Sequence, residues 1–310
     1  HGILRRRTSV AANVPRVRRS PRLIATVAAC LAALAALSAP QPAQARAHRL
    51  HHVWVFVMEN HSLGQILGSR QAPFLNKLAR RHRVATRFYA PAHPSLPNYL
   101  AMISGSTHGC GNDHCQPGYG GRTIAGQLTA HGMQWRGFFE GLPHRGYIGN
   151  DRGQYVRHHN PFVYFRSITS KPRQRRHIER LHALRRSLHH PPALSFIVPT
   201  NAHNMHDGSI QTGDRWLHRW VTLVRHSRAY RHNGTILIVW DEGHNDRSGC
   251  CFQSIDGGRV PLFIIARHLP RHHRLERPAT TYSLLSALQH GFRLPPLGVA
   301  TLARPLPLPI

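Results

Sequence analysis

Short apolar runs alternate with amphipathic runs along the chain from about residue 51 to residue 292. Apolar runs rich in β-branched residues predict buried strands, and apolar residues three or four positions apart predict helices. The predicted strands are 51–60, 133–141, 193–200, 235–240 and 260–266, and the predicted helices are 72–82, 94–105, 122–132, 177–188, 212–227 (with Thr212 or Asp214 near its start) and 280–292. This alternation favours an α/β fold with a central, mostly parallel sheet that helices cover on both faces.

The first 45 residues have a different pattern. Residues 1–22 contain many arginines and no acid, residues 23–39 are apolar or small, and Ala-Gln-Ala ends at Ala45. This order is typical of a signal peptide that is cleaved near Ala45. A membrane anchor is the alternative, but the apolar run is short for a span and rich in alanine. We therefore expect export to a periplasm, a cell wall or the medium, and a single domain over 46–310.

Four cysteines follow the predicted leader: Cys110, Cys115, Cys250 and Cys251. An even number of cysteines in an exported chain suggests disulfides. Cys110 and Cys115 are the most natural local pair, whereas Cys250 and Cys251 could pair with each other or elsewhere. A zinc site is the weaker interpretation, because the spacing lacks a CxxC pair.

The chain is strongly basic, with 41 Lys and Arg against 12 Asp and Glu, a formal net charge of +29. One interpretation is a solvated basic surface. The other is affinity for polyanions such as phospholipid surfaces, nucleic acids or phosphorylated substrates. The 27 histidines add positive charge in acid, so polyanion binding should tighten as the pH falls.

Although acids are scarce, several polar side chains directly follow predicted strands. They are Glu59 and Asn60 after the first strand, Asn201, His203, His206 and Asp207 after 193–200, and Asp241 and Glu242 after 235–240. In open α/β sheets the ligand crevice lies at the carboxyl ends of the strands, so these groups should meet at one rim. Paired carboxylates beside a buried sheet are costly unless a metal ion, nearby Arg or His, or exposure at the strand end stabilises them. Carboxylate and amide oxygens with imidazoles suit a divalent metal.

Ser95 lies at the start of the predicted helix 94–105, two residues after His93. Backbone N–H groups and the helix dipole favour an anion there, so Ser95 suits the role of a phosphate acceptor. The alternative is a plain N-cap. His206 and Asp207 are either a general acid with its orienting partner or polar residues of a surface loop.

Six segments in order resemble the bacterial phosphoesterase family, over about residues 52–298. They are VMENHSLGQILGSRQAPFLNKLA, HPSLPNYLAMISGSTHG, HHNPFVYF, NMHDGSIQTGDRWL, IVWDEGHNDRSGCC and GGRVPLFII. The family has an alkaline-phosphatase-like fold and includes secreted acid phosphatases and phospholipases C. In length and in the MHDGSI…GDRWL segment the chain is most similar to secreted acid phosphatases active on phosphomonoesters, including a type that acts on phosphatidylinositol 3-phosphate.

The resemblance implies roles for individual residues. Ser95 aligns with the nucleophilic Ser or Thr of the wider superfamily. The implied metal or active-site ligands are Glu59, Asn60, Asp241 and Glu242, the implied catalytic residues besides Ser95 are His93, His159, His206 and Asp207, and the implied phosphate-binding residues are Asn98 and Arg259. Two positions depart from the family pattern: Asn204 stands where relatives usually have Asp, and Arg259 where many have His. The number of metal ions is therefore open.

We expect a secreted acid phosphatase that hydrolyses phosphomonoesters, phosphoinositide head groups among them, with a divalent metal. Ser95 would attack phosphorus in line to give a phosphoseryl intermediate, and His206 would protonate the leaving alkoxide. The alternatives are a phospholipase C-type phosphodiesterase, a catalytically decayed basic polyanion-binding protein, and a sulfatase-like or phosphonate activity. The expected partners are phosphorylated small molecules or phospholipid head groups, and an anionic membrane surface. No specific nucleic acid is expected, and the oligomeric state is open.

Overall fold

The computed structural model describes residues 50–251, 256–267, 269 and 274–309, which all belong to the compact unit His48–Ile310. The predicted leader 1–45 lies outside these residues, so cleavage and export stay predictions. Within the described ranges, no helix is both long and apolar enough to cross a lipid bilayer.

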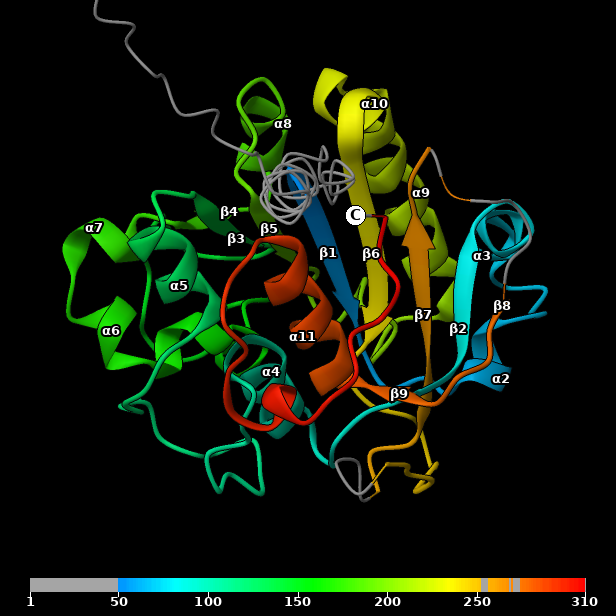
Figure 1. The fold of residues 1–310 in the computed structure, drawn as a ribbon, viewed down its shortest axis with the longest axis horizontal. Coiled ribbons are helices and arrows are strands. Elements are labelled where there is room, and N and C mark those ends of the chain that lie inside the picture. Colours follow the sequence, from blue (N-terminus) through cyan, green and yellow to red (C-terminus); the bar gives the residue numbers. More distant parts are fainter. Residues whose placement is uncertain (1–49, 252–255, 268, 270–273, 310) are drawn as a thin grey trace, which may run out of the picture. The chain divides into compact units, whose positions relative to one another are not determined.

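One mixed sheet forms the centre of this unit, with the strand order β4-β3-β5-β1-β6-β7-β2-β8, and β9 paired with β2 (Figure 1). The strands are β1 (His52–Met58), β2 (Arg83–Tyr89), β3 (Trp135–Phe139), β4 (Ile178–Arg180), β5 (Leu194–Val198), β6 (Gly234–Trp240), β7 (Arg259–Ile265), β8 (Arg274–Leu275) and β9 (Ala279–Thr280). All pairings are parallel except the two that β7 makes with β6 and β2.

The two central strands explain where the site forms. Every residue of β6 is buried, as are all residues of β1 except His52, which fits strands covered on both faces. The register pairs Met58 with Trp240, so the two strands end side by side. The residues that follow them, Glu59 and Asp241, therefore meet at the carboxyl edge of the sheet.

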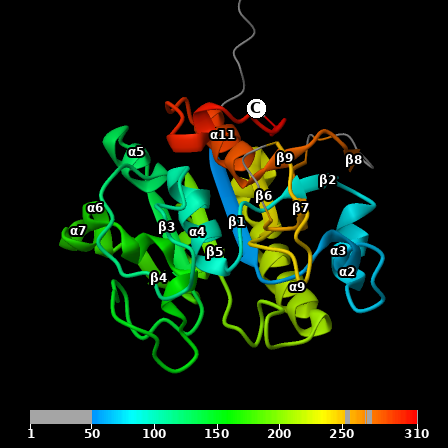
Figure 2. The same cartoon turned by 90° about the horizontal axis from the view of Figure 1, so that it is seen from below.

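Helices cover both faces of the sheet, as predicted (Figure 2). One face carries α4 (Ser95–Ser104), α5 (Ile124–Ala130) and α11 (Thr281–Gly291), and the other carries α3 (Pro73–Ala79), α9 (Ile210–His226) and α10 (Arg228–Asn233). Shorter helices are α2 (Leu63–Ile66), α6 (Arg166–Thr169), α7 (Pro172–Arg175) and α8 (Ala183–Ser187), with 3₁₀ turns η1 (Arg157–His159), η2 (Pro161–Tyr164) and η3 (Gly298–Thr301). The α/β class and the mostly parallel sheet are confirmed.

Some predicted elements were wrong in detail. The segment 177–188, predicted as one helix, is strand β4 followed by the short helix α8, because Ile178 pairs with Gly137 of β3. The strand β2 was not predicted. Helix α9 begins at Ile210 with Ser209 as its N-cap, not at Thr212 or Asp214. Asp214 is buried instead, and its carboxylate accepts hydrogen bonds from two N–H groups of α3.

The structure pairs Cys110 with Cys115, as predicted. Cys250 pairs with its neighbour Cys251, which is one of the alternatives that the sequence left open.

Candidate functional site

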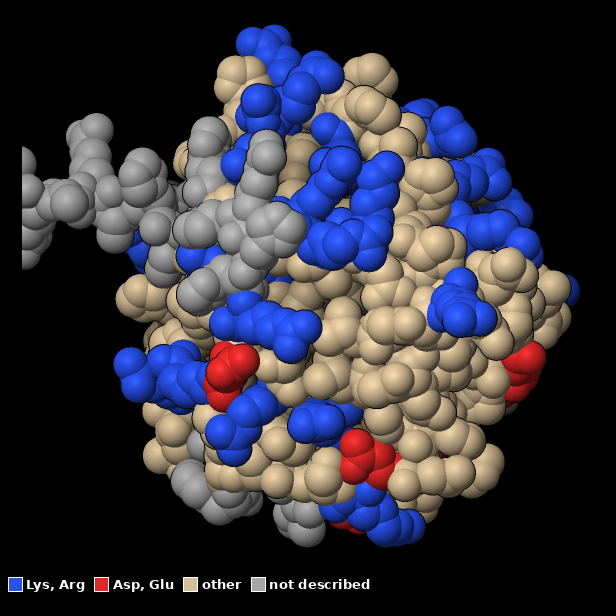
Figure 3. All heavy atoms as spheres, turned by 90° about the vertical axis from the view of Figure 1, so that its right-hand side faces the viewer, with Lys and Arg blue, Asp and Glu red and all other residues tan. Residues whose placement is uncertain are grey.

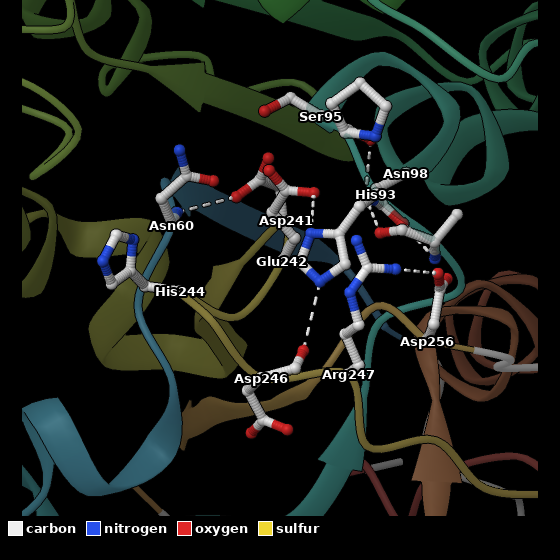
Figure 4. A network of polar contacts seen from close by, with 12 residues as sticks. Asn60, His93, Ser95, Asn98, Asp241, Glu242, His244, Asp246, Arg247 and Asp256 are labelled. Carbon is white, nitrogen blue, oxygen red and sulfur yellow. Dashed lines mark hydrogen bonds and ion pairs between the residues drawn. The ribbon is translucent and has the colours of Figure 1, made fainter.

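Three carboxyl groups lie together where β1 and β6 end, and Figure 4 shows two of them, those of Asp241 and Glu242. Glu59 and Asp241 are fully buried, and Glu242 is 5% exposed. Asn60 joins the two strand ends, because its backbone N–H donates to Asp241 Oδ1 at 3.1 Å. Its φ of 50° is left-handed, a conformation that Asn tolerates better than most residues. All four residues predicted as metal ligands therefore lie together in the fold.

This concentration of buried acid changes how the carboxyls ionise. Burial, followed by the charge of Asp241, raises the pKa of Glu59 well above its ordinary value. Burial and the charge of Glu242 raise the pKa of Asp241 to about 7. The cluster thus retains protons near neutral pH unless a cation is present, because like charges in a dry site cannot all ionise.

His93 supplies a positive charge that contacts this cluster directly. Its Nδ1 lies 2.7 Å from Glu242 Oε2, and its Nε2 lies 3.1 Å from the carbonyl oxygen of Asp246. Both acceptors require an N–H, so the ring carries two protons and is an imidazolium. The hydrogen bond to Glu242 is the main reason why the pKa of His93 rises to about 9.

Ser95 points its hydroxyl at the acid cluster and does not cap its helix. It is the first residue of α4, is 3% exposed, and donates to Glu59 Oε2 at 3.0 Å. The N–H of Leu96, which an N-cap would otherwise engage, donates to Asp113 Oδ1 at 2.8 Å. The N-cap interpretation of Ser95 is therefore wrong. One turn later, the buried hydroxyl of Tyr99 donates to Glu59 Oε1.

The predicted histidines lie at different depths. His159 is buried with its Nε2 3.4 Å from Glu59 Oε1, and burial lowers its pKa well below the ordinary value. It is therefore a neutral neighbour of Glu59 and not an ion-pair partner. His206 is exposed, and its Nδ1 lies 2.6 Å from Asp207 Oδ1.

The two predicted phosphate ligands have different surroundings. The Asn98 side chain accepts from the N–H of Ala92 and donates to the carbonyls of Ala92 and Pro94. It thus holds the turn that carries His93, and its polar atoms are engaged there. Arg259 is exposed at the start of β7, and its backbone N–H donates to Asp246 Oδ2 at 3.0 Å. It lies on the same rim, since β7 runs antiparallel to β6.

The position that departs from the family pattern, Asn204, is fully buried. Its side chain donates to Asn201 Oδ1 and accepts from the N–H of His206. Its carbonyl oxygen accepts from the N–H of Glu59 at 2.9 Å. Asn204 therefore fixes the loop that carries His206 against the end of β1.

A cavity of about 410 Å³ opens beside the cluster. It is lined by Asn60, His93, Pro94, Glu242, Gly243, His244, Asn245 and Arg247. His244, Arg247, Tyr99, Asp113 and Asp246 were not singled out from the sequence. Only Tyr99 had a usable signal, since four residues of spacing place it on the same face of α4 as Ser95.

The donor atoms of the cluster fit a divalent cation. Among the described residues, no group of three or more His, Cys, Asp or Glu side chains is arranged as a metal centre. However, Asp241 Oδ2 and Asn60 Oδ1 are buried and have no hydrogen-bond partner in the described part of the chain. Unpaired buried oxygens beside three acids suit a hard cation, which prefers carboxylate and amide oxygen ligands.

The charge state of His93 predicts a pH dependence of stability. Because its pKa of about 9 lies above the ordinary 6.5, His93 stabilises the fold below about pH 6.5, and this contribution is lost as the pH rises toward 9. In the presence of a chelator, the free energy of unfolding should fall by about 2 kcal/mol over this range after allowance for solvent screening. Urea unfolding of His93→Gln should show a smaller fall, whereas the exposed control His189→Gln should behave like the parent. If the free energy of unfolding falls equally with pH in His93→Gln and in the parent, the assignment of His93 as an imidazolium is contradicted.

Comparison with known proteins places this site in a family. A model of the phosphoesterase family matches residues 69–295. The phosphatidylinositol-3-phosphatase of Mycobacterium tuberculosis is 32% identical over 262 residues, which cover 82% of this chain and 81% of the relative. The phosphate-repressible acid phosphatase of Penicillium chrysogenum is 30% identical over 235 residues, 72% of this chain and 55% of the relative. The chain thus spans about half the length of this fungal relative.

Solved structures agree on the fold. A protein of the alkaline phosphatase superfamily from Vibrio parahaemolyticus aligns with a TM-score of 0.56 at 12% identity, over 79% of this chain and 67% of that one. The phosphonate monoester hydrolase of Agrobacterium radiobacter aligns with a TM-score of 0.55 at 13% identity, over 83% and 78%. The fold is that of the alkaline phosphatase superfamily.

The family match and the named relatives, which are phosphatases, define a hydrolase of phosphoric esters. The chain belongs to the phosphoesterase family. The matched range includes Ser95, His159, His206 and Asp241, whereas Glu59 precedes it.

Proposed function

We propose that this chain is an acid phosphatase that hydrolyses phosphomonoesters through Ser95 as the nucleophile. The observation that carries the proposal is the Ser95 hydroxyl, which is buried at the start of α4, free of any capping role, and bonded to Glu59. A hydroxyl at a helix N-terminus beside a cation-binding acid cluster is placed where a phosphate group would be held.

The surrounding residues have separate roles in the proposed reaction. Glu59 accepts the hydrogen bond of Ser95, so it is placed to take the hydroxyl proton as Ser95 attacks phosphorus. The imidazolium of His93 lines the cavity and favours a bound anion. A divalent cation held by Asp241, Glu242, Glu59 and Asn60 would stabilise negative charge on the phosphoryl oxygens.

His206 is proposed to protonate the leaving alkoxide. Its Nδ1 is held by Asp207 Oδ1, which fixes the ring and leaves Nε2 available for the substrate. Water then releases phosphate from Ser95, with the same groups moving protons in the opposite direction.

The substrate class that we propose is a phosphorylated small molecule or a phosphorylated lipid head group. The names of the relatives support it, since they include acid phosphatases and a phosphatidylinositol-3-phosphatase. The basic leader predicted over 1–45 supports an exported enzyme.

The proposal is tested by comparing p-nitrophenyl phosphate with bis(p-nitrophenyl) phosphate across acidic and neutral pH. The monoester should be preferred by at least about tenfold in kcat/KM, because a site with a cation and an imidazolium stabilises the dianion more. Preference for the diester would contradict the monoesterase assignment and indicate a phosphodiesterase.

A further inference from the structure

A second basic cavity lies far from the acid cluster. It has a volume of about 760 Å³, which is within the usual range for ligand pockets. Its lining consists of Arg81, His82, Thr222, Arg225, His226, Tyr230, Arg231, Ala266, Arg267 and Leu269. The lining thus contains four arginines and two histidines, but neither Asp nor Glu. We call it the arginine pocket.

The arginine pocket is at the opposite edge of the sheet from Ser95. Arg267 lies just after the end of β7, whereas Arg259 at the start of β7 lies on the rim of the acid cluster. A strand of this length separates the two sites by about 20 Å. One small substrate cannot reach both, so the arginine pocket is not part of the proposed catalytic site.

The guanidinium groups of the pocket have no carboxylate partners. None of the ion pairs found in the described ranges involves Arg81, Arg225, Arg231 or Arg267. Figure 3 shows the right-hand side of Figure 1, where Lys and Arg cover much of the upper half and the visible acids lie in the lower half. The positive charge is therefore not neutralised by neighbouring acids on this face.

Buried and hydrogen-bonded side chains form the floor of the arginine pocket. Tyr230 is 4% exposed and lines the pocket together with half-buried Arg225. Arg225 Nε is buried without a hydrogen-bond partner in the described part of the chain. Arg267 is held over the same floor, because its Nη1 donates to the carbonyl oxygen of Arg231 at 3.1 Å. Four like charges around one hollow repel one another, so that a bound anion would stabilise the arrangement.

We propose that the arginine pocket binds an anion with two or more phosphate groups, at a site separate from catalysis. Guanidinium forks match phosphate oxygens in pairs, and four arginines can engage two phosphate groups at once. The ligand is either a soluble bisphosphate or the multiply phosphorylated head group of a lipid.

The test uses Arg81→Gln/Arg231→Gln, since both arginines are exposed and neither forms an ion pair. The matched control is Arg173→Gln/Arg186→Gln, which removes the same charge from exposed positions outside the pocket. Calorimetric titration with methylenebisphosphonate should show binding that weakens at least tenfold in the pocket variant and is unchanged in the control. Turnover of p-nitrophenyl phosphate should be equal in all three proteins, which also shows that they are folded.

Sedimentation with phosphatidylcholine vesicles that contain phosphatidylinositol bisphosphate distinguishes the source of the anion. If the parent binds these vesicles and the pocket variant does not, the ligand is a lipid head group. If the pocket variant loses only the binding of methylenebisphosphonate, the ligand is soluble. Equal affinity for methylenebisphosphonate in the parent, the variant and the control would overturn the proposal. So would a loss of p-nitrophenyl phosphate turnover confined to the pocket variant, because the cavity would then belong to the catalytic site.

Discussion

Ser95→Ala is expected to lower kcat for p-nitrophenyl phosphate by at least about 10³-fold, because it removes the only proposed nucleophile. KM should change little, since the cavity residues that would hold the phosphate, His93 among them, are untouched. Steady-state kinetics on the purified variant measures both parameters. Folding should be preserved, because Ser95 makes no capping bond and replacing it removes a single hydroxyl.

The chain offers a matched control on the same helix. Ser104 is likewise buried, at the other end of α4, and its hydroxyl donates to the carbonyl oxygen of Leu100. Ser104→Ala should retain kcat within about twofold and cost about 1 kcal/mol of stability from the lost hydrogen bond. A Ser95→Ala protein as active as Ser104→Ala would rule out Ser95 as the nucleophile.

Asp241→Asn is expected to change activity and stability in opposite directions. Activity should fall roughly 10²-fold or more, and the variant should need a higher concentration of divalent cation to reach half of its maximal activity. With the cation chelated above pH 7, however, the variant should be more stable than the parent by on the order of 1–3 kcal/mol. The reason is that the substitution removes one of three buried acids that repel one another. The raised pKa of Asp241 reflects the free energy that this burial and repulsion cost.

Asp214→Asn is the control for that experiment, because Asp214 is equally buried but lies outside the site. Its carboxylate accepts hydrogen bonds from the N–H groups of Phe74 and Leu75 at the start of α3. The variant should therefore lose stability and keep its activity, the reverse of Asp241→Asn. If chelated Asp241→Asn unfolds as readily as Asp214→Asn, the acid cluster is not a strained cation site.

Much of the fold could be predicted because its central strands are buried on both faces. The runs that became β1 and β6 are almost wholly apolar, and a polar residue follows each one directly. Both the parallel sheet and the meeting of Glu59 with Asp241 follow from that pattern. By contrast, β2 begins with Arg83 and is interrupted by half-buried Thr86 and exposed Arg87, so it gave no continuous apolar signal.

The positions of site residues could be predicted where these residues adjoin a strand or a helix. The contacts of residues on loops could not be predicted. Ser95 could be placed because a helix visibly begins there, but the sequence could not show whether it caps that helix. The contact of His93 with Asp246 depends on a long loop whose path is set by tertiary packing. The charge of His93 therefore became evident only when both of its hydrogen-bond partners were known.

The central claim is that Ser95 carries the phosphoryl group during turnover. The most direct measurement is to quench the enzyme in acid during hydrolysis of p-nitrophenyl phosphate and map its peptides by mass spectrometry. We expect a phosphoryl group on Ser95 in the parent, and none in Ser95→Ala. A phosphorylated residue elsewhere, such as a histidine, or efficient turnover with no trapped phosphoenzyme and full activity in Ser95→Ala, would contradict it.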